Sequence, residues 1–249
     1  GHDGWFAADL DNVSFSIHEG EIFGIAGVSG NGQQELEEVL AGLRKAEAGR
    51  VILGETDITH SSSLARWQMG VGYIPCDRMQ VGSIGDFSLV ENTAMNFYFD
   101  DDYSRRGIVD YRRMRTLTEE IVSEYSVMTP SPDMKAKNLS GGNLQKLILG
   151  RVLSRRPRLL IASLPTQGLD VGATEFVRNK LMEAKVEKAG ILLISEDLDE
   201  VLSLSDWVAP IYEGKLTGII AGEEAEREIV GAMMAGSRLI WTMFRFLSM

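Results

Sequence analysis

A glycine-rich loop with phosphate-binding spacing stands near the start of the chain. Its frame runs from Gly27 to Gly32 in the pattern G-x-x-x-x-G, and Gln33 and Gln34 follow. In the complete pattern, G-x-x-x-x-G-K-[ST], backbone N–H groups hold the phosphates, a lysine reaches the β/γ oxygens and a hydroxyl binds Mg²⁺. Here neutral amides replace both the lysine and the hydroxyl. The candidate nucleotide-binding residues are Gly27, Ser29, Gly30, Asn31, Gly32, Gln33 and Gln34. For this loop alone, a plain strand-to-helix turn is at least as good an interpretation.

The sequence around these glycines predicts a strand, a loop and a helix. Residues 21–26 form a short apolar run after a Glu-Gly turn, which indicates a buried strand. Residues 33–43 carry apolar side chains at helical spacing, namely Leu36, Val39, Leu40 and Leu43. Residues 159–162 and 190–195 are uninterrupted apolar runs, typical of parallel strands buried on both faces. The predicted fold class is therefore α/β with a mainly parallel sheet.

Weaker patterns complete the predicted organisation. Shorter strands are predicted at 51–53 and 71–75, a surface helix at 110–128, and an antiparallel hairpin from 207–212 and 215–220. We expect the following division: 1–89 as the first part of the nucleotide-binding core, 90–150 as a helical subdomain, 151–222 as the second part of the core, and 223–249 as a helical C-terminal tail.

A second motif is far more specific than the glycine loop. Residues 139–146 read LSGGNLQK, which resembles the signature of ABC proteins, LSGGQ or LSGGN followed by Q-x-K. In that family the serine and glycine N–H groups lie at a helix N-terminus and contact the γ-phosphate bound by the opposite domain. The resemblance implies that Ser140, Gly141, Gly142 and Asn143 act in trans. A chance capping turn is the alternative.

The next family motif is present in outline but lacks its carboxylates. Residues 159–173 read LLIASLPTQGLDVGA, where the ABC family has approximately LLILDEPTxGLDVGA. Ser163 stands where the Mg²⁺-associated Asp belongs, and Leu164 where the Glu that polarises water belongs. No Asp or Glu occurs between Met134 and Leu169, so a shifted alignment restores neither group. Asp170, the D-loop aspartate, is retained.

Two further positions depart from the family pattern. The switch histidine is replaced by Glu196 in the string LLISEDLDE, and every histidine of the chain lies at or before residue 60. The Q-loop glutamine corresponds to Cys76. The resemblance implies that residues 76–87 face transmembrane subunits. No intact catalytic residue is expected, because the charged groups expected at Gln33, Ser163, Leu164 and Glu196 are missing together.

Composition narrows the remaining functions. A net charge of −11 argues against DNA or RNA, which are bound mainly by clustered Lys and Arg. One cysteine fits a reducing compartment, and no run of about twenty apolar residues predicts a membrane span. The start, GHDG without Met, suggests a cut or tagged end. Trp5 or Phe6 is expected to pack in the core or, alternatively, under adenine, and the apolar residues 238–249 are expected to pack on protein rather than on a membrane.

The resemblance spans about residues 15–218 and is closest to the second nucleotide-binding half of sugar and nucleoside ABC importers. It implies ATP bound weakly or in trans, with Mg²⁺ only in the site of a partner domain. The implied partners are another nucleotide-binding domain, expected in the same polypeptide, transmembrane permease subunits and, indirectly, an extracytoplasmic solute-binding protein. The expected location is the cytoplasmic face of the membrane, peripheral. Two alternatives stay open: an active ABC ATPase, and a soluble ABC protein without a transporter.

Overall fold

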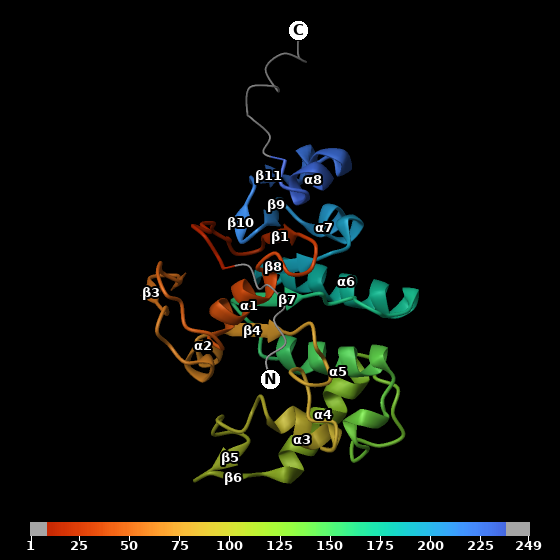
Figure 1. Cartoon of the computed structure of the whole chain (residues 1–249). Coiled ribbons are helices and arrows are strands. Elements are labelled where there is room, and N and C mark those ends of the chain that lie inside the picture. Colours follow the sequence, from red (N-terminus) through yellow and green to blue (C-terminus); the bar gives the residue numbers. More distant parts are fainter. Residues whose placement is uncertain (1–8, 238–249) are drawn as a thin grey trace, which may run out of the picture.

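The computed structural model describes residues 9–237, and its core is a mostly parallel sheet (Figure 1). The parallel strands lie in the order β4, β7, β8, β1 and β9. Their bounds are β1 (Ile22–Ala26), β4 (Val71–Ile74), β7 (Leu159–Ser163), β8 (Gly190–Ser195) and β9 (Trp207–Tyr212). The short strands β10 (Lys215–Leu216) and β11 (Ile220–Ala221) pair with β9 in the antiparallel sense. The predicted α/β class with a mainly parallel sheet is confirmed.

The central strands are buried on both faces, as their apolar runs predict. Every residue of β1 and β8 is buried. Alternate side chains separate into two clusters, because successive residues of a strand point to opposite faces. Phe23, Ile161 and Leu192 pack with Leu36 on one face of the sheet. On the other face, Ile22, Leu160 and Ile191 join a larger cluster that includes the helices α5 and α6.

Helices pack on both faces of this sheet. The helices of the core are α1 (Gln33–Ala41), α2 (Ser63–Gln68), α6 (Val171–Val186), α7 (Leu198–Leu204) and α8 (Arg227–Met234). The prediction for 33–43 is two residues too long, because Gly42 ends α1 in the left-handed conformation with φ of 77°. Leu43 therefore lies beyond the helix and is 54% exposed.

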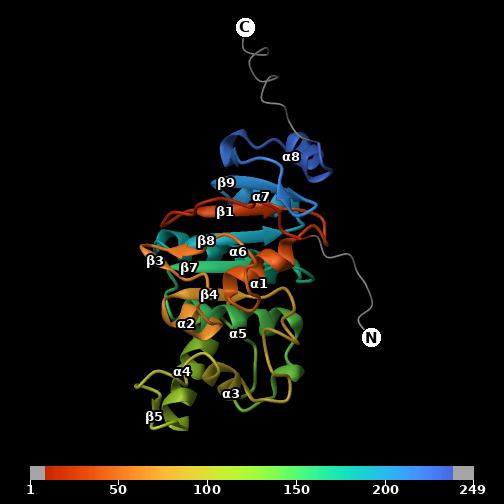
Figure 2. The same cartoon turned by 60° about the vertical axis from the view of Figure 1, so that its left-hand side comes forward.

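A group of helices, which we call the helical subdomain, lies beyond the β4 edge of the sheet (Figure 2). It contains α3 (Leu89–Ala94), α4 (Tyr111–Glu124), a 3-10 turn (Ala136–Asn138) and α5 (Gly141–Leu153). The helix predicted at 110–128 is α4, which begins after Asp110; its carboxylate accepts the Arg112 and Arg113 amides. Two small hairpins were not predicted. One pairs β2 (Ile52–Leu53), where a strand was predicted without a partner, with β3 (Thr56–Asp57); the other pairs β5 (Ser104–Arg105) with β6 (Ile108–Val109).

The C-terminal part continues from the β9 edge. The predicted hairpin is confirmed as β9 with β10. Its second strand is shorter than predicted, because only two residues of β10 pair with β9. Helix α8 packs against β9, and the rest of the expected tail, 238–249, lies outside the described residues, as do Trp5 and Phe6. Among residues 9–237, no helix is both long and apolar enough to cross a bilayer.

Candidate functional site

Parallel pairing gathers the predicted site positions at one edge of the sheet. The glycine loop follows β1, Cys76 follows β4, Ser163 ends β7 and Glu196 follows β8. Because these four strands are parallel neighbours, their carboxyl ends lie at the same edge, where α/β sheets bind ligands. The signature residues 140–143 lie elsewhere, at the start of α5 in the helical subdomain. The structure thus brings together one group of predicted residues and keeps the signature apart from it.

The glycine loop has the backbone form of a phosphate cradle. Gly30 and Gly32 have φ of 88° and 104°, a left-handed conformation that side chains other than glycine rarely adopt. Gly32 is the N-cap of α1, so the loop leads directly into the positive end of a helix. Val28, Ser29 and Gly30 are exposed at the surface. The backbone needed to bind an anion has therefore been kept.

The Gln33 side chain makes hydrogen bonds inside that loop, one of which a lysine side chain is unable to make. Its Oε1 atom accepts the Asn31 N–H at 3.0 Å, and its Nε2 atom donates to the Val28 carbonyl at 2.9 Å. A Cβ built on Gly27 would lie 2.5 Å from Gln33 Nε2, so the amide rests against the glycine backbone. The amide group thus pairs one donor and one acceptor of the loop internally, and a lysine has no acceptor with which to hold the Asn31 N–H.

Hydrogen bonds from the turn between β9 and β10 also hold the glycine loop. Asn31 Oδ1 accepts the Glu213 N–H at 2.9 Å, and the Asn31 carbonyl accepts the Gly214 N–H at 3.0 Å. The turn between β9 and β10 therefore fixes the conformation of the loop. Gln34, at the position of the metal-binding hydroxyl, donates instead to Glu38 Oε1 at 2.8 Å along α1.

The two positions where the family has carboxylates, Ser163 and Leu164, carry uncharged side chains. Ser163 is buried at the end of β7, and Leu164 has φ of 43°, a left-handed conformation that costs energy for a branched side chain. The Leu164 N–H donates to the Ile194 carbonyl at 2.8 Å, which ties this turn to β8. The backbone of the turn is intact, while its side chains offer no carboxylate for Mg²⁺.

One carboxylate beside this site was missed by sequence reasoning. Glu37 on α1 is 5% exposed; its Oε1 accepts the Tyr73 hydroxyl at 3.1 Å, and its Oε2 has no hydrogen-bond partner. Burial raises the pKa of Glu37, against the opposing influence of the Ser163 and Tyr73 hydroxyls. Burial and Glu37 together raise the pKa of Tyr73. The sequence gives no signal for this group, because Glu35, Glu37 and Glu38 look alike on a surface helix.

Cys76, at the Q-loop position, is half-buried. Its Sγ atom lies 3.5 Å from Gln167 Oε1. Burial raises the pKa of the Cys76 thiol, and the nearby carboxylates of Glu37 and Asp77 add to that shift. The thiol is therefore neutral near neutral pH and poorly suited to bind a hard cation such as Mg²⁺.

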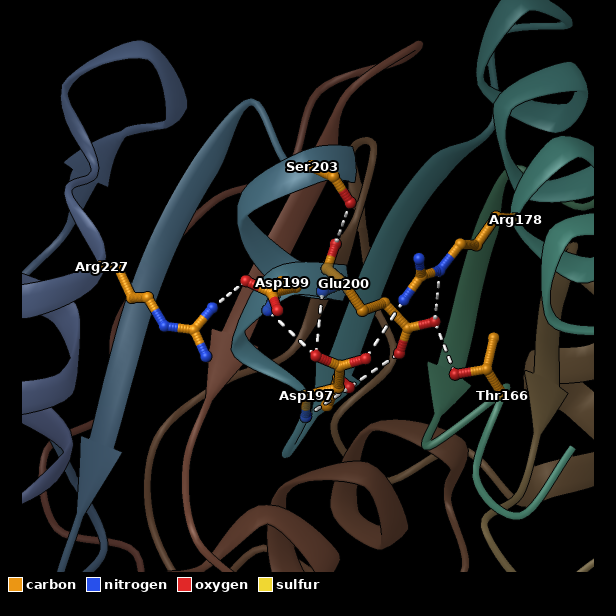
Figure 3. Close-up of polar contacts among 8 residues, drawn as sticks. Thr166, Arg178, Asp197, Asp199, Glu200, Ser203 and Arg227 are labelled. Carbon is orange, nitrogen blue, oxygen red and sulfur yellow. Dashed lines mark hydrogen bonds and ion pairs between the residues drawn. The ribbon is translucent and has the colours of Figure 1, made fainter. Parts of the chain in front are cut away.

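Glu196, at the switch position, lies next to a polar network that Figure 3 shows in close-up. Glu196 is exposed after β8, and Asp197 next to it caps α7. Glu200 is fully buried, and its carboxylate accepts the Thr166 hydroxyl at 2.7 Å and the Ser195 hydroxyl at 2.7 Å. This network connects α7 with the ends of β7 and β8, although no residue in it stands where the family has its catalytic groups.

The signature turn, residues 140–142, presents a helix N-terminus. Ser140 is the N-cap of α5, and its hydroxyl accepts the Asn143 N–H at 3.3 Å. The first intrahelical bond to Ser140 comes from Leu144, so the Gly141 and Gly142 amides belong to the unpaired first turn. Gly141 is exposed. Unlike the glycine loop, this turn has, within the described part of the chain, no side chain that accepts a hydrogen bond from its Gly141 and Gly142 amides.

The other two predicted residues near this turn act as local supports. Asn143 Oδ1 accepts the Met128 N–H at 2.8 Å, and Asn143 Nδ2 donates to Ser140 Oγ at 3.0 Å. Asp170 is the N-cap of α6 and accepts the Ala173 N–H at 2.8 Å. A Cβ built on Gly142 would lie 3.8 Å from Asp170 Oδ2, so the D-loop aspartate stands beside the signature turn.

Comparison with known proteins agrees with this geometry. A family model described as "ABC transporter" matches residues 10–167, more than half of the chain. The chain belongs to the ABC transporter family. Two solved ABC cassettes share its fold: a nucleotide-free ATP-binding cassette (TM-score 0.72, 24% identity, covering 94% of this chain and 91% of that one) and a dimeric bacterial cassette (TM-score 0.73, 20% identity, 85% and 90%). The ABC-type fold is thereby confirmed.

Curated relatives are more similar in sequence. The glucose import ATP-binding protein TsgD13 of Haloferax volcanii is 43% identical over 229 residues, covering 91% of this cassette and 42% of that protein. The guanosine import ATP-binding protein NupO of Bacillus subtilis is 42% identical over 226 residues, covering 91% and 44%. The cassette therefore spans less than half the length of these relatives.

Proposed function

We propose that this cassette is one nucleotide-binding domain of an ABC importer for sugars or nucleosides. In this proposal its own ATP site is degenerate, and its signature turn completes the ATP site of a partner domain. The names of the two relatives, which import glucose and guanosine, support the substrate class. Because each relative is more than twice as long as the matched segment, a second cassette in the same polypeptide is the proposed partner.

One observation carries the degenerate site: the Gln33 amide pairs the Asn31 N–H and the Val28 carbonyl inside the loop. A phosphate that entered the cradle would have to displace this amide, and it would find no lysine to balance its charge. Ser163, Leu164 and Glu196 add the loss of the groups that bind Mg²⁺, polarise water and contact the γ-phosphate. Each lost charged contact costs about 3 kcal/mol of transition-state stabilisation, so the combined losses predict no useful turnover.

The signature turn supports action in trans. Its Gly141 and Gly142 amides stand at the positive end of the 13-residue helix α5, an arrangement that favours a phosphate. We propose that Ser140, Gly141, Gly142 and Asn143 close over ATP and Mg²⁺ held by the partner, with Asp170 at the same interface. ATP hydrolysis then takes place at the partner's glycine loop.

The segment after Cys76 supports contact with a permease. Apolar side chains in this segment are 40–54% exposed, namely Met79, Val81, Ile84 and Phe87. Exposed apolar clusters of this kind mark interaction sites. We propose that residues 76–87 dock on transmembrane permease subunits at the cytoplasmic face of the membrane. An extracytoplasmic solute-binding protein then acts only indirectly, through the permease. The division into core (1–89 and 151–222), helical subdomain (90–150) and tail (223–249) belongs to the same proposal.

Calorimetric titration of this cassette with ATP, with and without Mg²⁺, tests the degenerate site. Hydrolysis is followed in the same samples. We expect weak or absent binding and no turnover. Tight Mg²⁺-dependent binding with turnover would overturn the proposal and favour an active ATPase. Co-purification with ribosomes or DNA, in place of a permease, would favour the soluble type of ABC protein.

A further inference from the structure

The loop between β7 and α6, residues 164–169, is held by side chains from several elements. We call it the β7–α6 loop. Gln145 of α5 donates to the Pro165 carbonyl at 2.8 Å, in a buried contact. The Thr166 hydroxyl donates to Glu200 of α7 at 2.7 Å. Although its catalytic side chains are gone, this loop remains a junction between the core and the helical subdomain.

The core side of this junction is firmly anchored (Figure 3). Glu200, which binds Thr166, also accepts the Ser195 hydroxyl and pairs with Arg178 of α6, whose Nε lies 3.4 Å from Glu200 Oε1. A buried carboxylate with this many partners is costly to move, because any displacement leaves charge unpaired. Gln167 directly follows the anchored Thr166, and its N–H donates to the Leu164 carbonyl at 3.1 Å, so its own carbonyl lies beside a fixed point of the core.

Arg78 joins that fixed point to the signature turn. Its Nη2 atom donates to the Gln167 carbonyl, and its Nη1 atom lies 3.4 Å from the Gly141 carbonyl. A Cβ on Gly141 would be 3.5 Å from Nη1, and one on Gly168 would be 3.9 Å from Nη2, so the guanidinium fills the notch between the two turns.

The chemistry of Arg78 suits a clamp. Among residues 9–237, no carboxylate lies within ion-pair distance of it, so its charge is directed to the two carbonyl groups. Such charge-assisted bonds are stronger than neutral ones, and the planar guanidinium presents two donors at once. Burial lowers the pKa of Arg78, opposed by Cys76 and Asp77, yet an arginine stays charged near neutral pH.

We infer that Arg78 is a positioning residue that clamps the signature turn to the β7–α6 loop and so orients residues 140–142 toward the partner's nucleotide. The functional half of this inference rests on the proposed action in trans. The contacts that hold the signature region to the β7–α6 loop come from protein side chains, the first of them Arg78. Gln145 is the second such contact, so loss of Arg78 loosens the turn without releasing it.

Hydrogen exchange of this cassette tests the clamp without a partner or ATP. We expect Arg78→Ala to raise amide exchange at residues 140–145 and 166–169 about tenfold, with Arg78→Lys intermediate because a lysine ammonium lacks the fork geometry. Arg115→Ala is the matched control, since Arg115 pairs with Asp133 in the helical subdomain. Its exchange at these two segments should equal that of the wild type. Unchanged exchange in Arg78→Ala would overturn the clamp.

ATPase kinetics of the full-length parent with its permease test the functional half. A loosened signature turn must be ordered each time the site closes on ATP, while the closed geometry is unchanged. We therefore expect Arg78→Ala to raise KM for ATP about tenfold and to change kcat less than twofold, with partial rescue by Arg78→Lys. A fall in kcat at constant KM would overturn the positioning role. Raised exchange with unchanged kinetics would confirm the clamp and contradict action in trans.

Discussion

The glycine loop and the signature turn share one backbone arrangement but differ in whether a side chain pairs with their amides. Both lead into a helix N-terminus, α1 in one case and α5 in the other. In the glycine loop the Gln33 amide pairs the Asn31 N–H, whereas the first-turn amides of Gly141 and Gly142 stay open. In the proposed function, one side chain closes an anion site while the backbone of that site stays intact.

Substitution of Gly141 by Asp should have the largest effect. A Cβ at this position meets no atom nearer than 3.5 Å, so the cassette should fold normally, and an Asp is acceptable in the first turn of a helix. In the proposed arrangement, however, its negative charge would face the partner's γ-phosphate. We expect ATPase activity of the full-length parent with its permease to fall about 100-fold.

The control for this variant is Gly231→Asp. Gly231 lies in α8, where a Cβ would also meet open space. This variant adds the same charge far from any proposed phosphate and should leave the ATPase rate within twofold of the wild type. An equal loss in both variants would mean that added charge, and not the signature turn, is responsible.

Opening the glycine loop should have an intermediate effect. Gln33→Lys removes the amide that pairs the loop and restores a cation, so we expect affinity for ATP to rise about tenfold by calorimetry, with no turnover. Gln33→Ala removes the amide without adding a cation, so it separates the effect of opening the loop from the effect of the added charge. If neither variant binds ATP better than the wild type, the Gln33 amide is not what closes the loop.

Much of the fold was predictable because its strongest signals are local. The runs 21–26, 159–162 and 190–195 lie within one residue of the observed strands, since fully apolar segments are buried wherever the sheet forms. The hairpin of β5 and β6 was missed because each strand has two residues and offers no period to detect. Local patterns therefore predict long, buried elements and miss short ones.

The residues around the site were less predictable. The sequence placed Gln33 and Ser163 where the family has its charged groups, but it did not show that Gln33 binds its own loop. Glu37 and Arg78 were missed because their surroundings come from distant segments: Tyr73 reaches Glu37 from β4, and Gly141 meets Arg78 from α5. Such contacts depend on how elements cross, which no short-range pattern contains.

The buried carboxylate of Glu37 makes a pH-dependent prediction. Burial raises its pKa above 4.5, so the folded chain holds this proton more tightly than the unfolded chain. The stability that the protonated group contributes is full below the unfolded pKa and is lost as the pH rises through the folded pKa. Glu37→Gln keeps an uncharged polar group, and we expect it to be more stable than the wild type by about 1 kcal/mol near pH 8.

Urea unfolding at several pH values measures this effect. Near pH 4 the two proteins should have similar free energies of unfolding, because Glu37 is then mostly protonated in both states. Glu47→Gln is the control, since Glu47 is exposed and its change should shift stability little at any pH. A constant difference between Glu37→Gln and the wild type from acid to alkaline pH would exclude ionisation as the cause.

Asn143 gives the smallest expected effect and separates support of the signature turn from contact with nucleotide. Asn143→Ala loses the bonds to Met128 N and to Ser140 Oγ, which predicts a loss of about 1 kcal/mol in stability and about a threefold rise in KM for ATP in the parent assembly. Asn143→Asp keeps the acceptor for Met128 and loses only the donor to Ser140, so its stability should stay close to that of the wild type. If Asn143→Ala instead reduced kcat as strongly as Gly141→Asp does, then Asn143 would contact the partner's nucleotide directly, and the contrast between the open signature turn and the closed glycine loop would have to include its side chain.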